Sequence, residues 1–145
     1  MSYLSPTANT SPSLATMPRS ARTLMAIGSA VRIAYGTGAL LAPLKMVQAR
    51  YAPDTHELED PRLLLRAFGG HQLVTGCLTL AATCSRRHAR QAASLSLLID
   101  MLDVGSAALE LRTRGHVDQT VLGGIAISGS GILTFAAAYR TLTRA

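Results

Sequence analysis

The stretch from Thr120 to Tyr139, TVLGGIAISGSGILTFAAAY, contains no charged side chain. A helix of about 20 residues, rising about 1.5 Å per residue, crosses the roughly 30 Å hydrocarbon core of a bilayer. The stretch offers no polar stripe to water on any side. Each of its internal glycines would cost about 1 kcal/mol in an aqueous helix, whereas small residues are common where membrane helices pack closely. We therefore expect a membrane-spanning helix here.

Three further apolar segments are of similar length. The four expected spans cover about residues 23–44, 63–84, 91–111 and 117–139, and none alternates apolar and polar residues as a strand does. Charged residues make up 15% of the chain, against roughly 25% in soluble domains. The sequence predicts an all-α fold, a four-transmembrane-helix bundle that forms a single membrane domain over residues 23–145. The alternative is a water-soluble helical bundle whose charged residues form solvated faces.

Residues 1–22 precede the first span and are rich in Ser, Thr and Pro. Such a stretch cannot bury enough apolar surface to offset its ordering entropy, which predicts a disordered tail. Arg19 and Arg22 ahead of an apolar run also describe a signal peptide, and the lack of acidic residues before Asp54 resembles an organelle transit peptide. The length of the run and the presence of Arg32 within it favour an uncleaved first span.

The net charge of +6 is unevenly distributed between the two sides of the expected bundle. Four spans place both termini and the connection between the second and third spans on one side. That side carries the larger share of the arginines: Arg19, Arg22, Arg86, Arg87, Arg90, Arg140 and Arg144. Because basic residues mark the cytoplasmic side, we expect a multi-pass protein of the plasma (inner) membrane with both termini cytoplasmic. The sequence has no basic patch with interleaved aromatic residues, which argues against nucleic-acid binding.

Three of the spans carry ionisable residues near their middles: Arg32 in the first, Arg66 and His71 in the second, and Asp100 and Asp103 in the third. Ionisable side chains at membrane depth are costly and usually face the bundle interior, paired with one another. By depth, Asp100 is the expected partner of Arg32. Arg66 lies nearer the non-cytoplasmic end of its span, where Asp103 or Glu110 could reach it.

Three roles for this polar core follow from the sequence. The structural interpretation is a set of buried ion pairs that fixes helix register and pairing in a non-enzymatic membrane protein. The first alternative is a small proton-linked transport protein, because intramembrane ionisable residues often mark such routes. His71, which changes charge near neutral pH, would be its titrating member. The second alternative is a redox accessory protein that binds a lipid or a quinone between helices.

Signals for metal and catalytic chemistry are weak. Cys77 and Cys84 lie about two turns apart on one expected helix, too far apart to form a disulfide. His56, His88 and His116 lie in separate connections and match no zinc spacing. No nucleophile stands beside the paired aspartates in sequence, and the chain lacks the Gly-rich phosphate loop with its Lys-Ser/Thr ending. We expect no catalytic residue, no metal and no cofactor.

Small residues recur at every fourth position along the first span: Ala26, Ala30, Ala34, Gly38 and Ala42. A row at this spacing forms a smooth ridge suited to close helix contact. We expect the row to pack inside the bundle, with a homo-oligomer contact in the bilayer as the alternative. Arg32 lies on the neighbouring row between Gly28 and Gly36, which would leave room for its long side chain.

Short motifs in three spans resemble a known group. Arg32 is followed by Gly38-Ala-Leu-Leu-Ala-Pro43, Arg66 leads into a glycine-containing second span that continues to Gly76, and Asp100-x-x-Asp103 lies in the third. In these features the chain is similar to small four-helix bacterial integral membrane proteins that are loosely DoxX-like. The resemblance implies a four-helix membrane bundle over roughly residues 23–139. Some DoxX-like proteins are linked to redox or thiol stress, but this chain has no Cys-x-x-Cys to support that role.

Overall fold

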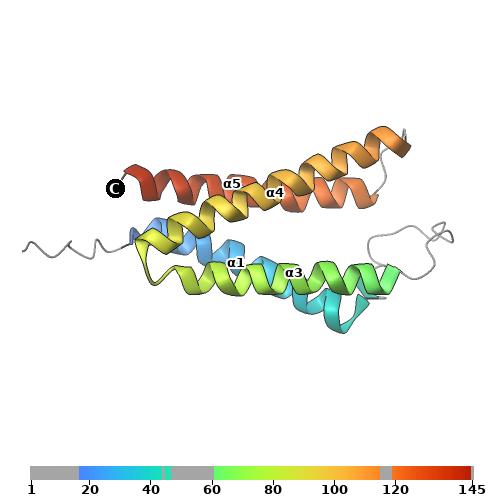
Figure 1. Cartoon of the computed structure of the whole chain (residues 1–145), viewed down its shortest axis with the longest axis horizontal. Coiled ribbons are helices and arrows are strands. Elements are labelled where there is room, and N and C mark those ends of the chain that lie inside the picture. Colours follow the sequence, from blue (N-terminus) through green and yellow to red (C-terminus); the bar gives the residue numbers. More distant parts are fainter. Residues whose placement is uncertain (1–16, 44, 47–60, 115–118, 145) are drawn as a thin grey trace, which may run out of the picture.

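The computed structural model describes residues 17–43, 45–46, 61–114 and 119–144. Within these ranges the chain forms four long helices and no strand: α1 (Arg19–Leu41), α3 (Pro61–Ala82), α4 (Arg86–Arg114) and α5 (Gln119–Arg144) (Figure 1). For this part of the chain, the prediction of an all-α fold with four helices is confirmed. The expected tail falls largely outside the described residues, and its last part, Arg19–Arg22, forms the first turn of α1.

Prolines mark three of the helix boundaries. α1 begins directly after Pro18, and α3 begins at Pro61, where the first helical position needs no N–H donor. α1 ends because Ala42 leaves the helical region, with φ −134° and ψ 54°. A residue that precedes a proline, here Pro43, is disfavoured in the helical conformation. The turn Thr83–Ser85 then reverses the chain from α3 into α4.

The helices form two antiparallel pairs that face each other. α1 packs along α3 and α4 packs along α5, while α1 also contacts α5 and α3 contacts α4. α1 and α4 therefore lie diagonally across the bundle. Figure 1 shows the start of α1, the α3–α4 turn and the end of α5 at one end, and the two pairs diverging toward the other. We call the first of these the basic end, because it carries Arg19, Arg22, Arg86, Arg87, Arg90, Arg140 and Arg144.

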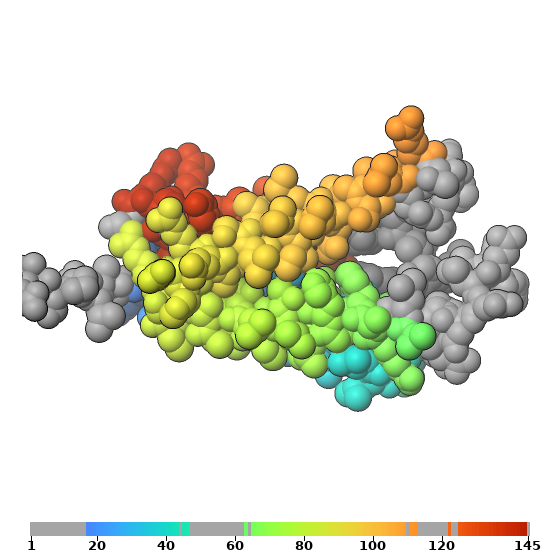
Figure 2. Space-filling view, in the orientation of Figure 1, coloured from blue at the N-terminus to red at the C-terminus, as the bar shows by residue number. Residues whose placement is uncertain are grey.

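The basic end is the more closely packed end of the bundle. Its buried apolar cluster is built mainly from small and flexible side chains: Met17, Ala21, Met25, Ala89, Ala93, Ala138 and Leu142. Arg86, at the start of α4, donates hydrogen bonds of 3.3 and 2.9 Å from Nε and Nη2 to the carbonyl oxygen of Leu142. This satisfies a carbonyl in the last turn of α5 that has no partner within its own helix. Side chains of α3 and α4 meet along this half of the visible face (Figure 2).

The buried face of α1 follows steps of four and three residues: Ala21, Met25, Ser29, Arg32, Gly36 and Ala39. Such steps form the seam of left-handed helix packing, in which helices cross at roughly 20°. The row of small residues at every fourth position lies beside this seam, and its members Ala30 and Ala34 are exposed. Ala26, Gly38 and Ala42 are half-buried, so the expectation that the row packs inside the bundle fails at its middle, because a constant four-residue step drifts away from a seam that repeats about every 3.5 residues.

Glycines bring the backbones of α1 and α3 into contact. A Cβ atom on Gly36 would lie 2.6 Å from the carbonyl oxygen of Gly69, and one on Gly69 would lie 2.9 Å from the carbonyl oxygen of Gly36. No larger residue fits without separating the helices. Gly36 and Gly28 were expected to make room for Arg32, but they serve helix contacts, since a Cβ atom on Gly28 would lie 2.7 Å from the ring of Phe135.

Large apolar side chains are exposed on all four helices, while the interior holds polar side chains beside its apolar cluster. The exposed set includes Ile27, Val31, Leu41, Leu63, Val74, Leu78, Leu98, Met101, Leu102, Leu122, Ile127 and Leu133. The buried polar set is Ser29, Arg32, Gln72, Thr79, Ser96, Asp100 and Ser128. A helical bundle that is stable in water has the opposite distribution, with its apolar stripe inside and its charged residues outside.

Among the described residues, two helices are long and apolar enough to cross a membrane: α1 and the Arg86–Leu109 part of α4. The core helix of a soluble protein passes the same test of length and composition, but such a helix is mostly buried. Here 28% of the apolar window of α1 and 17% of that of α4 are buried. Both helices therefore turn most of their apolar surface toward their surroundings.

Candidate functional site

A buried ion pair joins the two diagonal helices at mid-length. Arg32 of α1 and Asp100 of α4 meet with 2.7 Å between Nη2 and Oδ1, and their side chains are 7% and 6% exposed. Asp100 was the partner expected from depth alone. Because α1 and α4 each pack mainly against α3 and α5, this bond links the α1–α3 pair directly to the α4–α5 pair.

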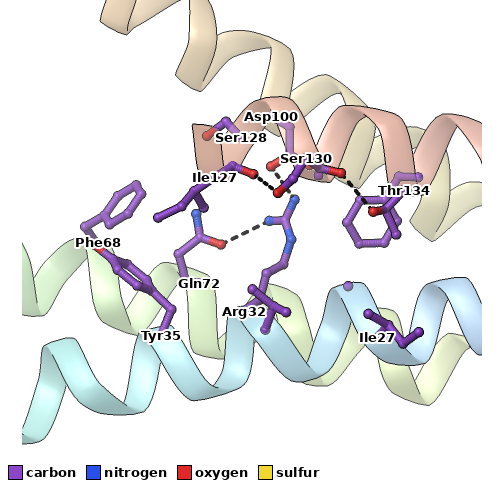
Figure 3. A pocket seen from close by; sticks show the side chains of 14 residues that line it. Ile27, Arg32, Tyr35, Phe68, Gln72, Asp100, Ile127, Ser128, Ser130 and Thr134 are labelled. Carbon is purple, nitrogen blue, oxygen red and sulfur yellow. Dashed lines mark hydrogen bonds and ion pairs between the residues drawn. The ribbon is translucent and has the colours of Figure 1, made fainter. Parts of the chain in front are cut away.

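Every helix contributes to the surroundings of the Arg32 guanidinium. Nη1 donates a hydrogen bond of 3.1 Å to Oε1 of Gln72 on α3, and Nη2 donates a second one, of 3.3 Å, to the carbonyl oxygen of Ser96 on α4. The ring of Phe135 on α5 lies 5.1 Å from the guanidinium carbon, within the range of a cation–π interaction. Figure 3 shows Arg32 rising from α1 beside Gln72 toward Asp100. The guanidinium is therefore held by two hydrogen bonds, an ion pair and an aromatic face together.

Gln72 and Phe135 were not among the residues expected at the site. The buried face of α3 consists of Leu65, Gly69, Gln72, Gly76 and Thr79, which follow steps of four and three. A polar side chain on a face of small residues at this spacing was the signal that could have identified Gln72. Phe135 carried no comparable signal, because an aromatic residue in an apolar segment is ordinary.

The expected pairing of Arg66 with Asp103 is wrong. In the described part of the chain Arg66 is exposed and forms no ion pair. The reason is rotational, since Arg66 follows Leu65 of the buried face and one residue turns a helix by about 100°. His71 is exposed for the same reason, as it precedes Gln72, although it still interacts electrostatically with Asp103. The side chain of Glu110, the alternative partner of Arg66, lies outside the described residues.

Asp103 lies one turn beyond Asp100, toward the diverging end of the bundle. It interacts electrostatically with Arg32 and accepts a hydrogen bond from the Ser128 side chain, but its Oδ2 atom is buried without a hydrogen-bond partner. Asp100 Oδ2 is also buried and unpartnered. Two carboxylates therefore share one arginine at this site.

Gly131 of α5 lets the Asp100 carboxylate lie against the helix backbone. A Cβ atom at position 131 would lie 2.7 Å from Asp100 Cγ, so any side chain there would displace the carboxylate. On the next turn toward the basic end, the hydroxyls of Thr79 and Ser96 lie 3.1 Å apart and join α3 to α4. The polar interior thus continues from α4 to both of its neighbours.

A pocket of about 280 Å³ lies between α1 and α5 beside the ion pair. Its inner wall includes Arg32, Gln72, Asp100, Ser128 and Gly131. Its outer wall includes Ile27, Val31, Tyr35, Phe68 and Ile127, which are apolar or aromatic. Figure 3 shows these side chains around the space between the two helices. The pocket combines an apolar rim with a polar floor.

Other candidate chemistry finds no support in the described residues. Cys77 and Cys84 are both exposed free thiols. His88 is exposed, whereas His56 and His116 lie outside the described part. No group of three or more His, Cys, Asp or Glu side chains within the described ranges could hold a metal ion.

No protein-family model, no curated protein and no solved structure matches this chain. The resemblance to the DoxX-like group therefore stays a prediction.

Proposed function

We propose that this chain is a non-enzymatic integral membrane protein of four transmembrane helices, and that the Arg32–Asp100 ion pair serves to lock its two helix pairs together. The observation that carries the proposal is the inverted distribution of residues: large apolar side chains cover the outside of all four helices, and the ion pair lies inside. An apolar outer surface around buried charges is typical of a protein that lies in a lipid bilayer.

The ion pair is well placed for an architectural role. Burial of two charges is costly, so a buried pair adds specificity more reliably than stability. Here the pair spans the diagonal of the bundle at mid-length, beyond the apolar cluster in which α1 and α4 meet at the basic end. Removal of one partner would leave the other charge buried and unpaired, which costs about 3–5 kcal/mol.

The orientation follows from the basic end. Arginines gather there from α1, α4 and α5, and the same end carries the α3–α4 turn. Positive charge at the ends of membrane helices favours the cytoplasmic side. We place the basic end in the cytoplasm and the protein in the plasma (inner) membrane.

A double-mutant cycle tests the architectural role. Arg32→Met and Asp100→Asn should each lower the free energy of unfolding in detergent micelles, measured by far-UV circular dichroism during denaturant titration. The double variant should lose less than the sum of the two, by about 1 kcal/mol or more, because neither charge is then left alone. Strict additivity would contradict a lock formed by this pair.

A second candidate, a proton-linked transport protein, is favoured by one observation. Asp103 Oδ2 is buried without a partner, and Asp103 also interacts electrostatically with the exposed His71. A carboxylate so placed could exchange a proton with a histidine at the bundle surface. Proton uptake by dye-loaded proteoliposomes that is abolished by Asp103→Asn and kept by Arg66→Met would support this candidate, and equal uptake by empty liposomes would reject it.

A further inference from the structure

The pocket between α1 and α5 opens sideways through the outer surface of the bundle. Val31 and Ile127, on facing helices, are 54% and 40% exposed and both line the pocket. Ile27, a third lining residue, is also exposed. In the membrane bundle proposed above, this opening faces acyl chains. A ligand would therefore enter from the lipid phase, which requires an apolar body.

The polar wall of this pocket contains an amide whose orientation is fixed. Gln72 accepts a hydrogen bond of 3.1 Å at Oε1 from Nη1 of Arg32. Because a guanidinium can only donate, the amide oxygen has to face Arg32, and Nε2 with its two N–H groups has to face the other way. Figure 3 shows this nitrogen turned away from Arg32, on the side of Ile127 and Phe68, which also line the pocket.

The Gln72 amide nitrogen is a donor without a partner. Gln72 is only 6% exposed, and in the described part of the chain its hydrogen bonding is limited to the bond at Oε1. Its side chain lines the pocket, whereas Oδ2 of Asp100 is sealed inside the protein against the α5 backbone at Gly131. Buried polar groups are normally paired, so Nε2 calls for an acceptor that reaches it from the pocket.

The other polar groups along the pocket are already committed. Ser130 Oγ donates to the carbonyl oxygen of Ile127 at 2.7 Å, and Thr134 Oγ1 donates to that of Ser130 at 2.8 Å. The charge of Arg32 is balanced by Asp100. A charged ligand would be buried here without a free counter-charge, which is costly. The pocket therefore favours a neutral ligand that brings a hydrogen-bond acceptor.

We propose that this pocket binds a neutral, lipid-soluble carbonyl compound, such as an aromatic ketone, whose oxygen accepts a hydrogen bond from Nε2 of Gln72. Entry from the lipid phase rests on the membrane bundle proposed above. Tyr35 and Phe68 pack edge to face with 5.9 Å between ring centroids and, with Phe135, offer aromatic walls to a ring. The volume of about 280 Å³ is near the lower end of ligand pockets, so the body would be about one ring with a short chain.

Three probes of similar shape test the requirement for an acceptor. The purified full-length protein in maltoside micelles is titrated by calorimetry with benzylacetone, butylbenzene and 4-phenylbutan-2-amine at neutral pH, and partitioning is corrected with empty micelles. The ketone should bind at one site per chain and about threefold to tenfold tighter than butylbenzene, because only its oxygen pairs the amide. The protonated amine cannot accept and should bind no tighter than butylbenzene. Equal affinity of ketone and butylbenzene, or no binding of the ketone, would overturn the proposal.

Infrared spectroscopy of the bound ketone tests which group donates to it. A hydrogen bond to a carbonyl oxygen lowers its stretching frequency, and an isotope-edited difference spectrum isolates the ligand band. Bound benzylacetone should absorb at a lower frequency than in empty micelles. Gln72→Met keeps a side chain of similar length without N–H groups and should abolish the shift. A bound ketone with the micelle frequency, or a shift that persists in folded Gln72→Met, would refute donation from Gln72.

Two substitutions on α5 test the place of binding and leave Gln72 in place. Ile127→Trp fills the mouth of the pocket and should weaken ketone binding at least about tenfold. Leu133→Trp, on the same helix and outside this pocket, should bind as the unchanged protein does. If Ile127→Trp does not fold, Val31→Trp closes the mouth from α1. Unchanged affinity in a folded mouth variant would place the ligand elsewhere.

These experiments and the test of the membrane bundle fail in different ways. A protein recovered without detergent would refute membrane insertion, and the three probes could still be titrated in buffer. A membrane-inserted protein that does not bind the ketone would refute the pocket and leave the bundle standing.

Discussion

At the residue scale, the position of a charge on its helix decides whether it enters the core. Arg32 lies on the buried seam of α1 and reaches Asp100, whereas Arg66 lies one position past the seam of α3 and stays outside. Both arginines were expected inside from their depth alone. Depth along a span can be counted in the sequence, but rotation about the helix axis depends on which neighbours the helix meets.

Substitution of these two arginines should therefore have different effects on the free energy of unfolding. Arg32→Met should lower the free energy of unfolding by about 3–5 kcal/mol, because Asp100 is then buried without a counter-charge. Arg66→Met should change it by less than about 0.5 kcal/mol, as is usual for exposed side chains. Denaturant titration of both variants in the same detergent gives the comparison. A similar loss in the two would mean that Arg66 also enters the core.

Alanine substitutions at two glycines of α5, Gly131 and Gly129, give a second matched comparison. Gly131→Ala should destabilise the bundle by about 1–3 kcal/mol, because the new Cβ atom meets the Asp100 carboxylate. A Cβ atom on Gly129 meets no atom within 4 Å, so Gly129→Ala should be neutral or stabilising by up to about 1 kcal/mol. Thermal melts of the two variants measure both stability changes. A stable Gly131→Ala protein would show that the carboxylate is free to move.

At the scale of elements, the sequence located the four helices but not the way in which they meet. Apolar length was sufficient to predict an all-α fold. The contact face of α1 was missed, since the regular row through Ala30 and Ala34 suggested a ridge where the structure uses the alternating seam through Gly36. Gln72 and Phe135, which complete the site around Arg32, come from α3 and α5, and no spacing in the sequence relates them to α1. Contacts between distant segments become visible only when the helices are placed together.

The α1–α3 contact gives a prediction at this scale. Gly69→Ala should separate the two helices and cost about 1–3 kcal/mol, because its Cβ atom would lie 2.7 Å from Cβ of Ala39. Gly70→Ala, the neighbouring change on the same helix, meets no atom within 4 Å and should be tolerated. Abundance in membranes and the unfolding midpoint report both effects. Loss of stability in Gly70→Ala alone would mean that α3 is rotated.

At the scale of the whole molecule, the bundle is closed at its basic end and holds its charge pair at mid-length. Small residues and the Arg86–Leu142 hydrogen bonds join α1, α4 and α5 at the basic end. Beyond the ion pair, the two helix pairs diverge (Figure 1). Apolar side chains surround this polar interior on all four helices. The proposed membrane bundle requires that this apolar surface be in contact with lipid.

Extraction of membranes from cells that express the tagged protein tests this claim most directly. We predict that the protein stays in the pellet after a carbonate wash at high pH and is released by a maltoside detergent. Arg66→Met should behave identically, since that side chain is not part of the core. Recovery in the soluble fraction, or release by carbonate without detergent, would contradict the membrane bundle and with it the interpretation of the exposed apolar surface.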